Sequence, residues 1–251
     1  MIPKIIHYCW FGRGEMPELA LKCIASWQIY LPEYEVIRWD EDNFDINQYQ
    51  YAADAYKARK FAFVSDVCRL HVLREIGGIY LDTDVEFIKP LPDSFLSHTA
   101  FTGFEDHLVS AGIIGSVKTG KWVNDLLTFF HSKSFYRPNG SLDINPITEM
   151  ITDFLGKEKG VLTNNTYQNI VGYCTIYPSE YFYPKSWKTL KMNVTANTYC
   201  IHHFAGSWID HNYTLLGKVA NFLLSKRVAD NWSRSYRKLI GKGEGKRQDS
   251  R

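Results

Sequence analysis

The sequence predicts an α/β fold with a mostly parallel central sheet flanked by helices. Three observations support this prediction. Strand-like and helix-like segments alternate over the first ninety residues, two adjacent glycines end the longest helical pattern, and prolines close the apolar run over 85–88. The chain has 251 residues, of which 45% are hydrophobic and 22% are charged. It can therefore form one large core, and it is neither collagenous nor wholly disordered.

Local periodicity predicts the individual elements. In the first half we expect strands at residues 2–10, 34–39, 79–81 and 85–88, and helices at residues 19–31, 47–60 and 61–76. In the second half we expect strands at 100–104, 109–115, 174–177 and 198–204, helices at 123–130 and 147–155, and a loop over 156–170. The sequence shows no internal repeat and no linker, so we expect one domain over residues 1–212. A basic amphipathic helical tail with a disordered end is expected over residues 213–251.

Charge and cysteine usage limit the classes of partner and location. The formal charge is +2, but residues 218–251 carry +7 and residues 1–217 carry −5. The basic tail is suited to an anionic membrane surface, or it is simply a solvated helix, and no nucleic-acid partner is expected. Five widely spaced cysteines give neither a disulfide framework nor a zinc site. Without a signal peptide or a membrane-spanning stretch, we expect a cytoplasmic protein, peripheral on the inner face of the cell membrane.

The strongest chemical signal is the pair Asp82 and Asp84, which flank Thr83 directly after a buried strand. Positions i and i+2 of a strand share a side, so both carboxylates can point at one object. Two such charges repel each other unless a cation lies between them, and carboxylate oxygens favour Mn²⁺ or Mg²⁺. A solvated turn is the alternative for an isolated D-x-D. The preceding strand and the Gly77-Gly78 helix stop favour the metal site.

Three further groups of residues support a ligand site. Asp66 and Arg69 share one face of the 61–76 helix and could bind hydroxyl and phosphate oxygens, or form only an intrahelical ion pair. The segment 202–208 begins with two histidines, either of which could be a third metal ligand, and ends with Ser207 and Trp208, which could donate to phosphate. The aromatic segment 7–12 could stack on a nucleobase or belong to the core.

In order along the chain, these segments resemble the D-x-D sugar-binding glycosyltransferases of family 32, which include bacterial capsular and O-antigen transferases and yeast-type mannosyltransferases. More distantly, the chain resembles the glucosyltransferase domains of large clostridial toxins. The resemblance rests on the start I-P-K-I-I-H-Y-C-W-F-G, the block from R-K-F-A-F-V-S-D to I-Y-L-D-T-D-V-E, and the segment I-H-H-F-A-G-S-W. It implies a GT-A-type single domain, a nucleotide-sugar donor, a divalent metal and retention of anomeric configuration.

The resemblance also implies roles for individual residues. It implies metal ligation by Asp84, by Asp82 through a water, and by His203, which matches the family position better than His202. It places Asp66 and Arg69 at the hydroxyls of the donor sugar and ribose. It also implies that four charged residues are catalytic: Asp66, Arg69, Asp82 and Asp84. The remaining donor-binding positions that it implies are Tyr8, Trp10, Tyr80, Gly112, Ser207 and Trp208. Many relatives carry an Asn-Ala step where this chain reads Ser110-Ala111-Gly112, so one hydroxyl contact is missing or is made by backbone.

The expected function is a retaining, metal-dependent transfer of a hexose, from a UDP-sugar by preference, to an oligosaccharide or lipid-linked acceptor in bacterial surface polysaccharide synthesis. No covalent nucleophile can be identified, and Glu105 and Asp106 are candidates for the acceptor side. The alternatives are a metal-dependent nucleotidyltransferase, an inactive carbohydrate-binding module, and a toxin-like transferase that modifies a protein.

Overall fold

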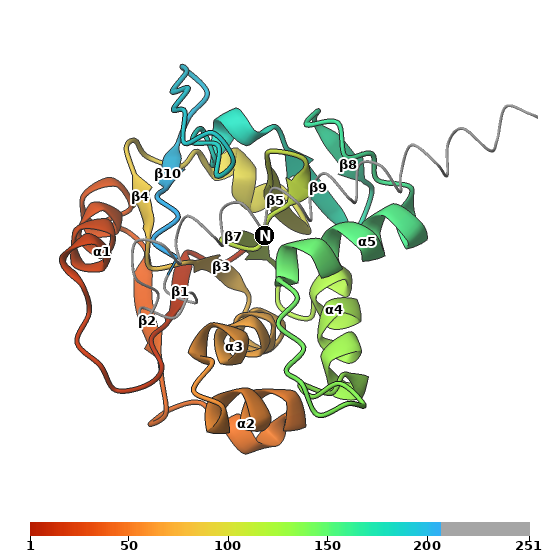
Figure 1. Cartoon of the computed structure of the whole chain (residues 1–251). Coiled ribbons are helices and arrows are strands. Elements are labelled where there is room, and N and C mark those ends of the chain that lie inside the picture. The colour runs from red at the N-terminus through yellow and green to blue at the C-terminus, as the bar shows by residue number, and fades with distance from the viewer. Residues whose placement is uncertain (207–251) are drawn as a thin grey trace, which may run out of the picture. The chain divides into compact units, whose positions relative to one another are not determined.

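The computed structural model describes residues 1–206, which form one compact unit. Its main sheet follows the order β2-β1-β3-β7-β5-β9-β8, with β6 paired to β5, and a small second sheet pairs β10 with β4 (Figure 1). The strands are β1 Ile5–Cys9, β2 Glu35–Trp39, β3 Gly78–Leu81, β4 Val85–Phe87, β5 Ala100–Glu105, β6 Leu108–Val109, β7 Ile113–Ser116, β8 Gln168–Ile170, β9 Cys174–Tyr177 and β10 Cys200–His202.

The expected α/β class with a mostly parallel sheet is confirmed. β2, β1 and β3 are mutually parallel, β7 is antiparallel to both β3 and β5, and β9 is parallel to β5. Five of these strands therefore point the same way, and only β7 and the edge strand β8 oppose them along the path of the main sheet. Strands that point the same way end at one edge of the sheet, so residues that follow β1, β3 and β5 are brought to a common edge.

The helices are α1 Glu18–Tyr30, α2 Gln50–Lys57, α3 Phe61–Glu75, α4 Lys121–Ser132 and α5 Ile147–Lys159, with short 3-10 turns η1 Ile46–Gln48, η2 Asp93–Ser97 and η3 Ser179–Tyr181. In Figure 1, α2, α3 and α4 lie together below the main sheet, and α1 lies beside β4. None of the helices within residues 1–206 is long and apolar enough to cross a bilayer.

The main sheet is buried on both faces, which is why its central strands read as continuous apolar runs. All four residues of β3 are buried, and they divide between two cores. Tyr80 packs in the core that includes residues of α2 to α5, whereas Ile79 and Leu81 pack in the core that includes Trp27 of α1 and Phe87 of β4. Each core therefore fixes one face of the strand that leads to the D-x-D motif.

The turn between α3 and β3 requires glycine because of its backbone conformation. Gly77 and Gly78 have φ of +79° and +119°, which side chains rarely tolerate. A Cβ at Gly78 would lie 2.6 Å from the Ile5 carbonyl oxygen and 3.0 Å from His7 Nε2. The Gly77 carbonyl is in turn hydrogen-bonded to that same imidazole nitrogen at 2.8 Å. The two glycines thus let the chain turn directly from α3 into β3 against β1.

Some element boundaries differ from those expected. The loop expected over 156–170 instead contains the end of α5, which stops at Lys159 before Gly160 in the left-handed conformation, and the edge strand β8. The single strand expected over 109–115 is divided into β6 and β7, and the helix expected over 47–60 is divided into η1 and α2. The expected tail, residues 213–251, lies outside the described residues.

Candidate functional site

The D-x-D motif lies in the turn that joins β3 to β4. The Asp82 N–H donates to the Gly112 carbonyl at 2.8 Å, and the Val85 N–H donates to the Asp82 carbonyl at 3.1 Å. β4 then pairs antiparallel with β10, with Val85 opposite His202. This pairing brings a histidine 118 residues away in sequence to the two aspartates, with His202 Nε2 3.0 Å from Asp84 Oδ1 and 4.0 Å from Asp82 Oδ2.

This group fits a divalent cation. Ligating atoms of Asp82, Asp84 and His202 all lie within 4.8 Å of one another. Two carboxylate oxygens and one imidazole nitrogen form a donor set that suits Mn²⁺ and, with more water ligands, Mg²⁺. Because burial opposes the charged form, the low pKa of Asp84 must come from its partners: it is held well below its usual range by His202 and by the backbone N–H of Ala205, 2.7 Å away.

The histidine at the aspartates is His202, and the metal-ligand assignment therefore moves from His203, the residue expected from the sequence, to His202. His203 points to another partner, Glu86, with 2.8 Å between its Nε2 and the carboxylate, and Glu86 also pairs with Lys22 at 2.9 Å. Strand alternation explains the difference. Cys200 and His202 are the buried positions of β10, so the second histidine of the pair lies on the other face of the strand.

Asp66 and Arg69 lie under the motif as a buried ion pair, with 2.9 Å between Arg69 Nη2 and Asp66 Oδ1. Arg69 Nη1 also donates to the Ala111 carbonyl at 2.7 Å and lies 3.4 Å from Asp82 Oδ1. Tyr80 completes the arrangement, since its ring lies 4.6 Å from the guanidinium carbon and its hydroxyl donates to Asp82 Oδ1 at 3.1 Å. Burial raises the pKa of Asp66 to about 7, against the opposing charge of Arg69.

The structure thus brings Asp66, Arg69, Tyr80, Asp82 and Asp84 together, an arrangement that the family resemblance implied. In this arrangement Arg69 directs its guanidinium at two carboxylates and at two backbone carbonyls, those of Ser65 and Ala111. These contacts hold Asp82 in place and set the guanidinium charge against the buried Asp66 carboxyl.

Gly112 forms the floor beside the aspartates. A Cβ built at this residue would lie 3.1 Å from Asp82 Oδ2 and 3.2 Å from His202 Cε1. Its N–H donates to Ser110 Oγ at 3.3 Å, and the Ser110 hydroxyl donates to Glu105 Oε2 at 2.8 Å. The missing side chain at this position therefore leaves the space in which the aspartate and imidazole groups meet.

Two further side chains, Tyr183 and Glu105, shape the site, and sequence reasoning missed the first of them. Tyr183 accepts a hydrogen bond from the Ile113 N–H at 2.7 Å and packs edge-on against the His202 ring at 5.7 Å. Glu105, a sequence-based candidate for the acceptor side, has its Oε2 4.0 Å from His202 Nδ1, a buried nitrogen with no hydrogen-bond partner among the described residues. The signal for Glu105 was its position at the end of β5, which ends at the same sheet edge as β3. No comparable signal pointed to Tyr183.

Tyr8 and Trp10 lie at the end of β1, the strand next to β3. Trp10 donates its indole N–H to the Gly14 carbonyl at 2.7 Å and is half-buried, so part of its ring remains open for stacking. Tyr8 packs edge-on against Trp27 at 5.6 Å and contributes to the core beneath α1. Ser207 and Trp208, the expected diphosphate contacts, lie outside the described residues.

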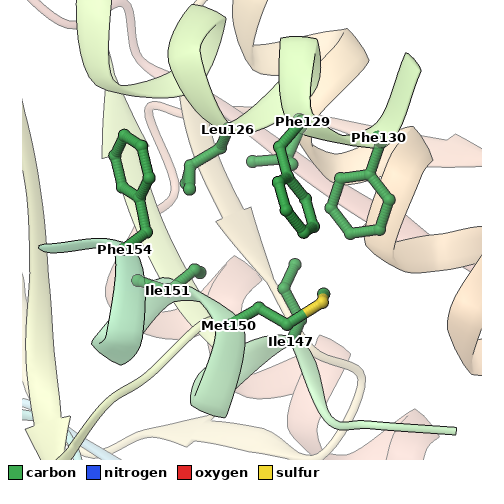
Figure 2. A pocket seen from close by; sticks show the side chains of 8 residues that line it. Leu126, Phe129, Phe130, Ile147, Met150, Ile151 and Phe154 are labelled. Carbon is green, nitrogen blue, oxygen red and sulfur yellow. The ribbon is translucent and has the colours of Figure 1, made fainter. Parts of the chain in front are cut away.

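A small pocket of a different kind lies between α4 and α5 (Figure 2). Its lining residues are all apolar: Leu70, Leu126, Phe129, Phe130, Ile147, Met150, Ile151 and Phe154. None of these side chains carries a charge or a strong hydrogen-bonding group, so this pocket offers nothing to hold a phosphate or a cation. Within residues 1–206, the group of side chains that could hold a metal ion is instead Asp82, Asp84 and His202 at the D-x-D turn.

Comparison with known proteins agrees with this location. Residues 17–102, which include the motif, match the family described as the glycosyltransferase sugar-binding region containing the DXD motif. The solved structure of the PaToxG glycosyltransferase superposes with a TM-score of 0.50 at 20% identity, over 63% of this chain and 70% of that one. The expected fold and the resemblance to the family 32 transferases are confirmed.

Three curated proteins are similar in sequence. "Subversion of eukaryotic traffic protein A" of Legionella pneumophila is 28% identical over 40% of this chain and 20% of its own length. Inositol phosphoceramide mannosyltransferase 3 of Schizosaccharomyces pombe is 34% identical over 40% of this chain and 29% of its own length. An uncharacterized glycosyltransferase of Acanthamoeba polyphaga mimivirus is 26% identical over 84% of this chain and 85% of its own. The chain thus spans less than a third of the first two relatives.

Proposed function

We propose that this chain, a distant relative of the D-x-D glycosyltransferases of family 32, is a retaining, metal-dependent hexosyltransferase that uses a nucleotide sugar, preferably a UDP-sugar. The observation that carries this proposal is the convergence of Asp82, Asp84 and His202 directly after β3. A bound Mn²⁺ or Mg²⁺ would supply Lewis-acid stabilisation of the charge that grows on the departing nucleoside diphosphate.

The residues of the chain then have distinct tasks. Asp84 and His202 would ligate the cation directly, and Asp82 would do so through a water while it faces the ribose. Arg69 and Tyr80 hold Asp82 in place through the contacts described above. Because Gly112 has no side chain, the donor sugar could come close to the metal-binding residues at this point. The backbone of Gly112 would then make the contact that a side chain makes in the relatives. Trp10 offers a ring for the nucleobase at the end of the adjacent strand.

In the proposed reaction the acceptor hydroxyl oxygen bonds to the anomeric carbon as the bond from that carbon to the phosphate oxygen breaks. The acceptor approaches from the face that the diphosphate leaves, and the departing phosphate takes the acceptor proton. No enzyme nucleophile is required. A trapped glycosyl-enzyme would contradict this mechanism.

The acceptor proposed is a saccharide carried on a lipid, and the enzyme would work at the inner face of the cell membrane in surface polysaccharide synthesis. The mannosyltransferase relative supports a lipid acceptor, since its name specifies inositol phosphoceramide. The Legionella relative, whose name refers to subversion of eukaryotic traffic, supports a second candidate, a toxin-like transferase acting on a protein. Transfer to a protein when a lipid-linked saccharide is also offered would favour that candidate.

The test is a panel of nucleotide sugars incubated with the protein and Mn²⁺, in which release of the nucleoside diphosphate is measured. We expect one donor to be hydrolysed, and Asp84→Asn to abolish turnover. Asp153→Asn, the same change at an exposed position of α5, is the matched control. Full activity of Asp84→Asn would refute the proposal, and release of pyrophosphate from a nucleoside triphosphate would indicate a nucleotidyltransferase.

A further inference from the structure

The loop between η3 and β10 carries an unusual combination of charge and exposed apolar surface. Residues 185–194, here called the basic loop, contain three lysines, and the chain has no acidic residue from 181 to 199. Three apolar side chains of the loop are largely exposed: Leu190 at 66%, Met192 at 48% and Val194 at 50%. A folded domain normally scatters exposed apolar side chains singly, so three in one cationic loop indicate a binding surface.

The basic loop has a defined conformation. Lys185 and Met192 form an antiparallel bridge, and the Ser186 N–H donates to the Lys191 carbonyl at 2.9 Å. Leu190 lies near the turn of this hairpin with φ of +59°, a conformation that costs a leucine free energy and that glycine or asparagine would adopt more readily. A strained, exposed leucine contributes nothing to the core, which favours a role in binding.

The base of the loop is attached to the candidate active site. The Lys185 ammonium donates to the His203 carbonyl at 2.6 Å, and the Ser186 hydroxyl donates to Asp106 at 3.2 Å. His203 follows the metal-ligand candidate His202, and its N–H donates to the Asp84 carbonyl at 3.0 Å. In Figure 1 the loop that precedes β10 projects from the body of the structure at the top of the view. It is therefore a projection anchored at the rim of the site.

We propose that the basic loop docks the enzyme onto an anionic membrane surface, with Leu190 and Met192 in the headgroup region and the two exposed lysines, Lys188 and Lys191, at the phosphates. Lysines attract anionic lipid, and apolar side chains beside them gain by leaving water. This inference deepens the proposed function, because it would place the site at the bilayer that carries a lipid-linked acceptor. It rests on residues 185–194 and does not depend on the basic tail expected over residues 213–251.

The test is sedimentation of the full-length protein with vesicles of phosphatidylcholine alone or with 30% phosphatidylglycerol. We expect binding only to the anionic vesicles. Lys188→Glu with Lys191→Glu should weaken it at least 30-fold, about 2 kcal/mol for the two lost lysines. The matched control is Lys157→Glu with Lys159→Glu on α5, where both lysines are also exposed and binding should change much less. Equal loss in both double variants would overturn the proposal, because it would show a general charge effect.

Leu190→Gly provides a second test that separates binding from folding. Glycine accepts the positive φ, so this variant should raise the Tm by about 2–4 °C while it weakens vesicle binding several-fold. A higher Tm with unchanged binding would show that Leu190 does not insert, and would overturn its part in the proposal.

The remaining outcomes are also decisive. Binding that survives the loop variants but disappears on truncation after Gly217 would overturn the proposal in favour of the tail. Loss of transfer to a protein acceptor with vesicle binding unchanged would assign the loop to protein recognition instead. Loop-dependent vesicle binding by a protein that hydrolyses no nucleotide sugar would refute the proposed function and leave the membrane surface established.

Discussion

A methyl group at Gly112 should damage the candidate metal site without affecting the rest of the fold. The backbone of Gly112 is fixed by hydrogen bonds from Asp82 N–H and to Ser110 Oγ, and it is not in the left-handed region, so the effect of Gly112→Ala is steric. The new Cβ would lie 3.1 Å from Asp82 Oδ2 and 3.2 Å from His202 Cε1, so one or both groups must move by a few tenths of an ångström.

The expected cost can be estimated from such crowding. Overpacking by one methylene-sized group typically costs about 1–3 kcal/mol. Here the strain falls on the two side chains that would hold the cation, so most of it should appear as weaker binding. At about 1.4 kcal/mol per factor of ten, the Kd for Mn²⁺ should rise roughly 5- to 150-fold. Titration calorimetry of the purified variant with Mn²⁺ measures this directly.

Gly156→Ala is the control for this prediction. Gly156 lies inside α5, and an added Cβ would have no neighbour nearer than 3.8 Å. This change should stabilise the protein by up to about 1 kcal/mol through helix propensity and leave Mn²⁺ affinity unchanged. If Gly112→Ala is folded and binds Mn²⁺ within twofold of the native protein, the claim that Gly112 makes room for the metal site is refuted.

Three further predictions follow from the same geometry. His202→Ala should weaken Mn²⁺ binding at least tenfold, whereas His203→Ala should leave it nearly unchanged because that imidazole faces Glu86; calorimetry that gave the reverse order would restore the sequence-based assignment. Arg69→Ala should lower the free energy of unfolding by about 3–5 kcal/mol, since it leaves the buried Asp66 without its partner. Urea denaturation measures this loss, and the control Arg13→Ala, at an exposed ion pair, should cost about 1 kcal/mol or less. Although burial opposes the imidazolium, Asp84 raises the pKa of His202 to about 9, so Mn²⁺ binding at pH 7 should release about one proton and the affinity should rise with pH up to about 9. Calorimetry in two buffers of different ionisation enthalpy measures the proton release. Binding without proton release would contradict the assignment of His202 as a ligand. Because this folded pKa lies above the unfolded value of about 6.5, the metal-free protein should also lose the contribution of His202 to stability as the pH rises through about 9.

The sequence by itself determined much of the local structure and of the motif chemistry. The two glycines after the 61–76 helix pattern could only be a sharp turn, and the apolar run after them had to be a buried strand that ends at Asp82. Helical spacing put Asp66 and Arg69 on one face of α3. These inferences succeeded because each depends on residues a few positions apart, where backbone periodicity alone decides which side chains meet.

The edge strand β8 was harder to predict, because the interactions that form it are not local. β8 is short, polar and partly exposed, so it has no apolar alternation to mark it, and it exists because it pairs with β9. Its hydrogen bonds are made with another segment, and local composition gives no signal for them.

Only the tertiary structure decided which groups complete the site. The choice between His202 and His203 depended on the pairing of β10 with β4, which joins segments more than a hundred residues apart and sets the face that each histidine occupies. The same long-range packing placed Glu105 beside His202 Nδ1 and Gly112 against Asp82. Residue types and spacing thus specified a candidate cation site after β3. Strand register, a property of two distant segments together, selected its third candidate ligand.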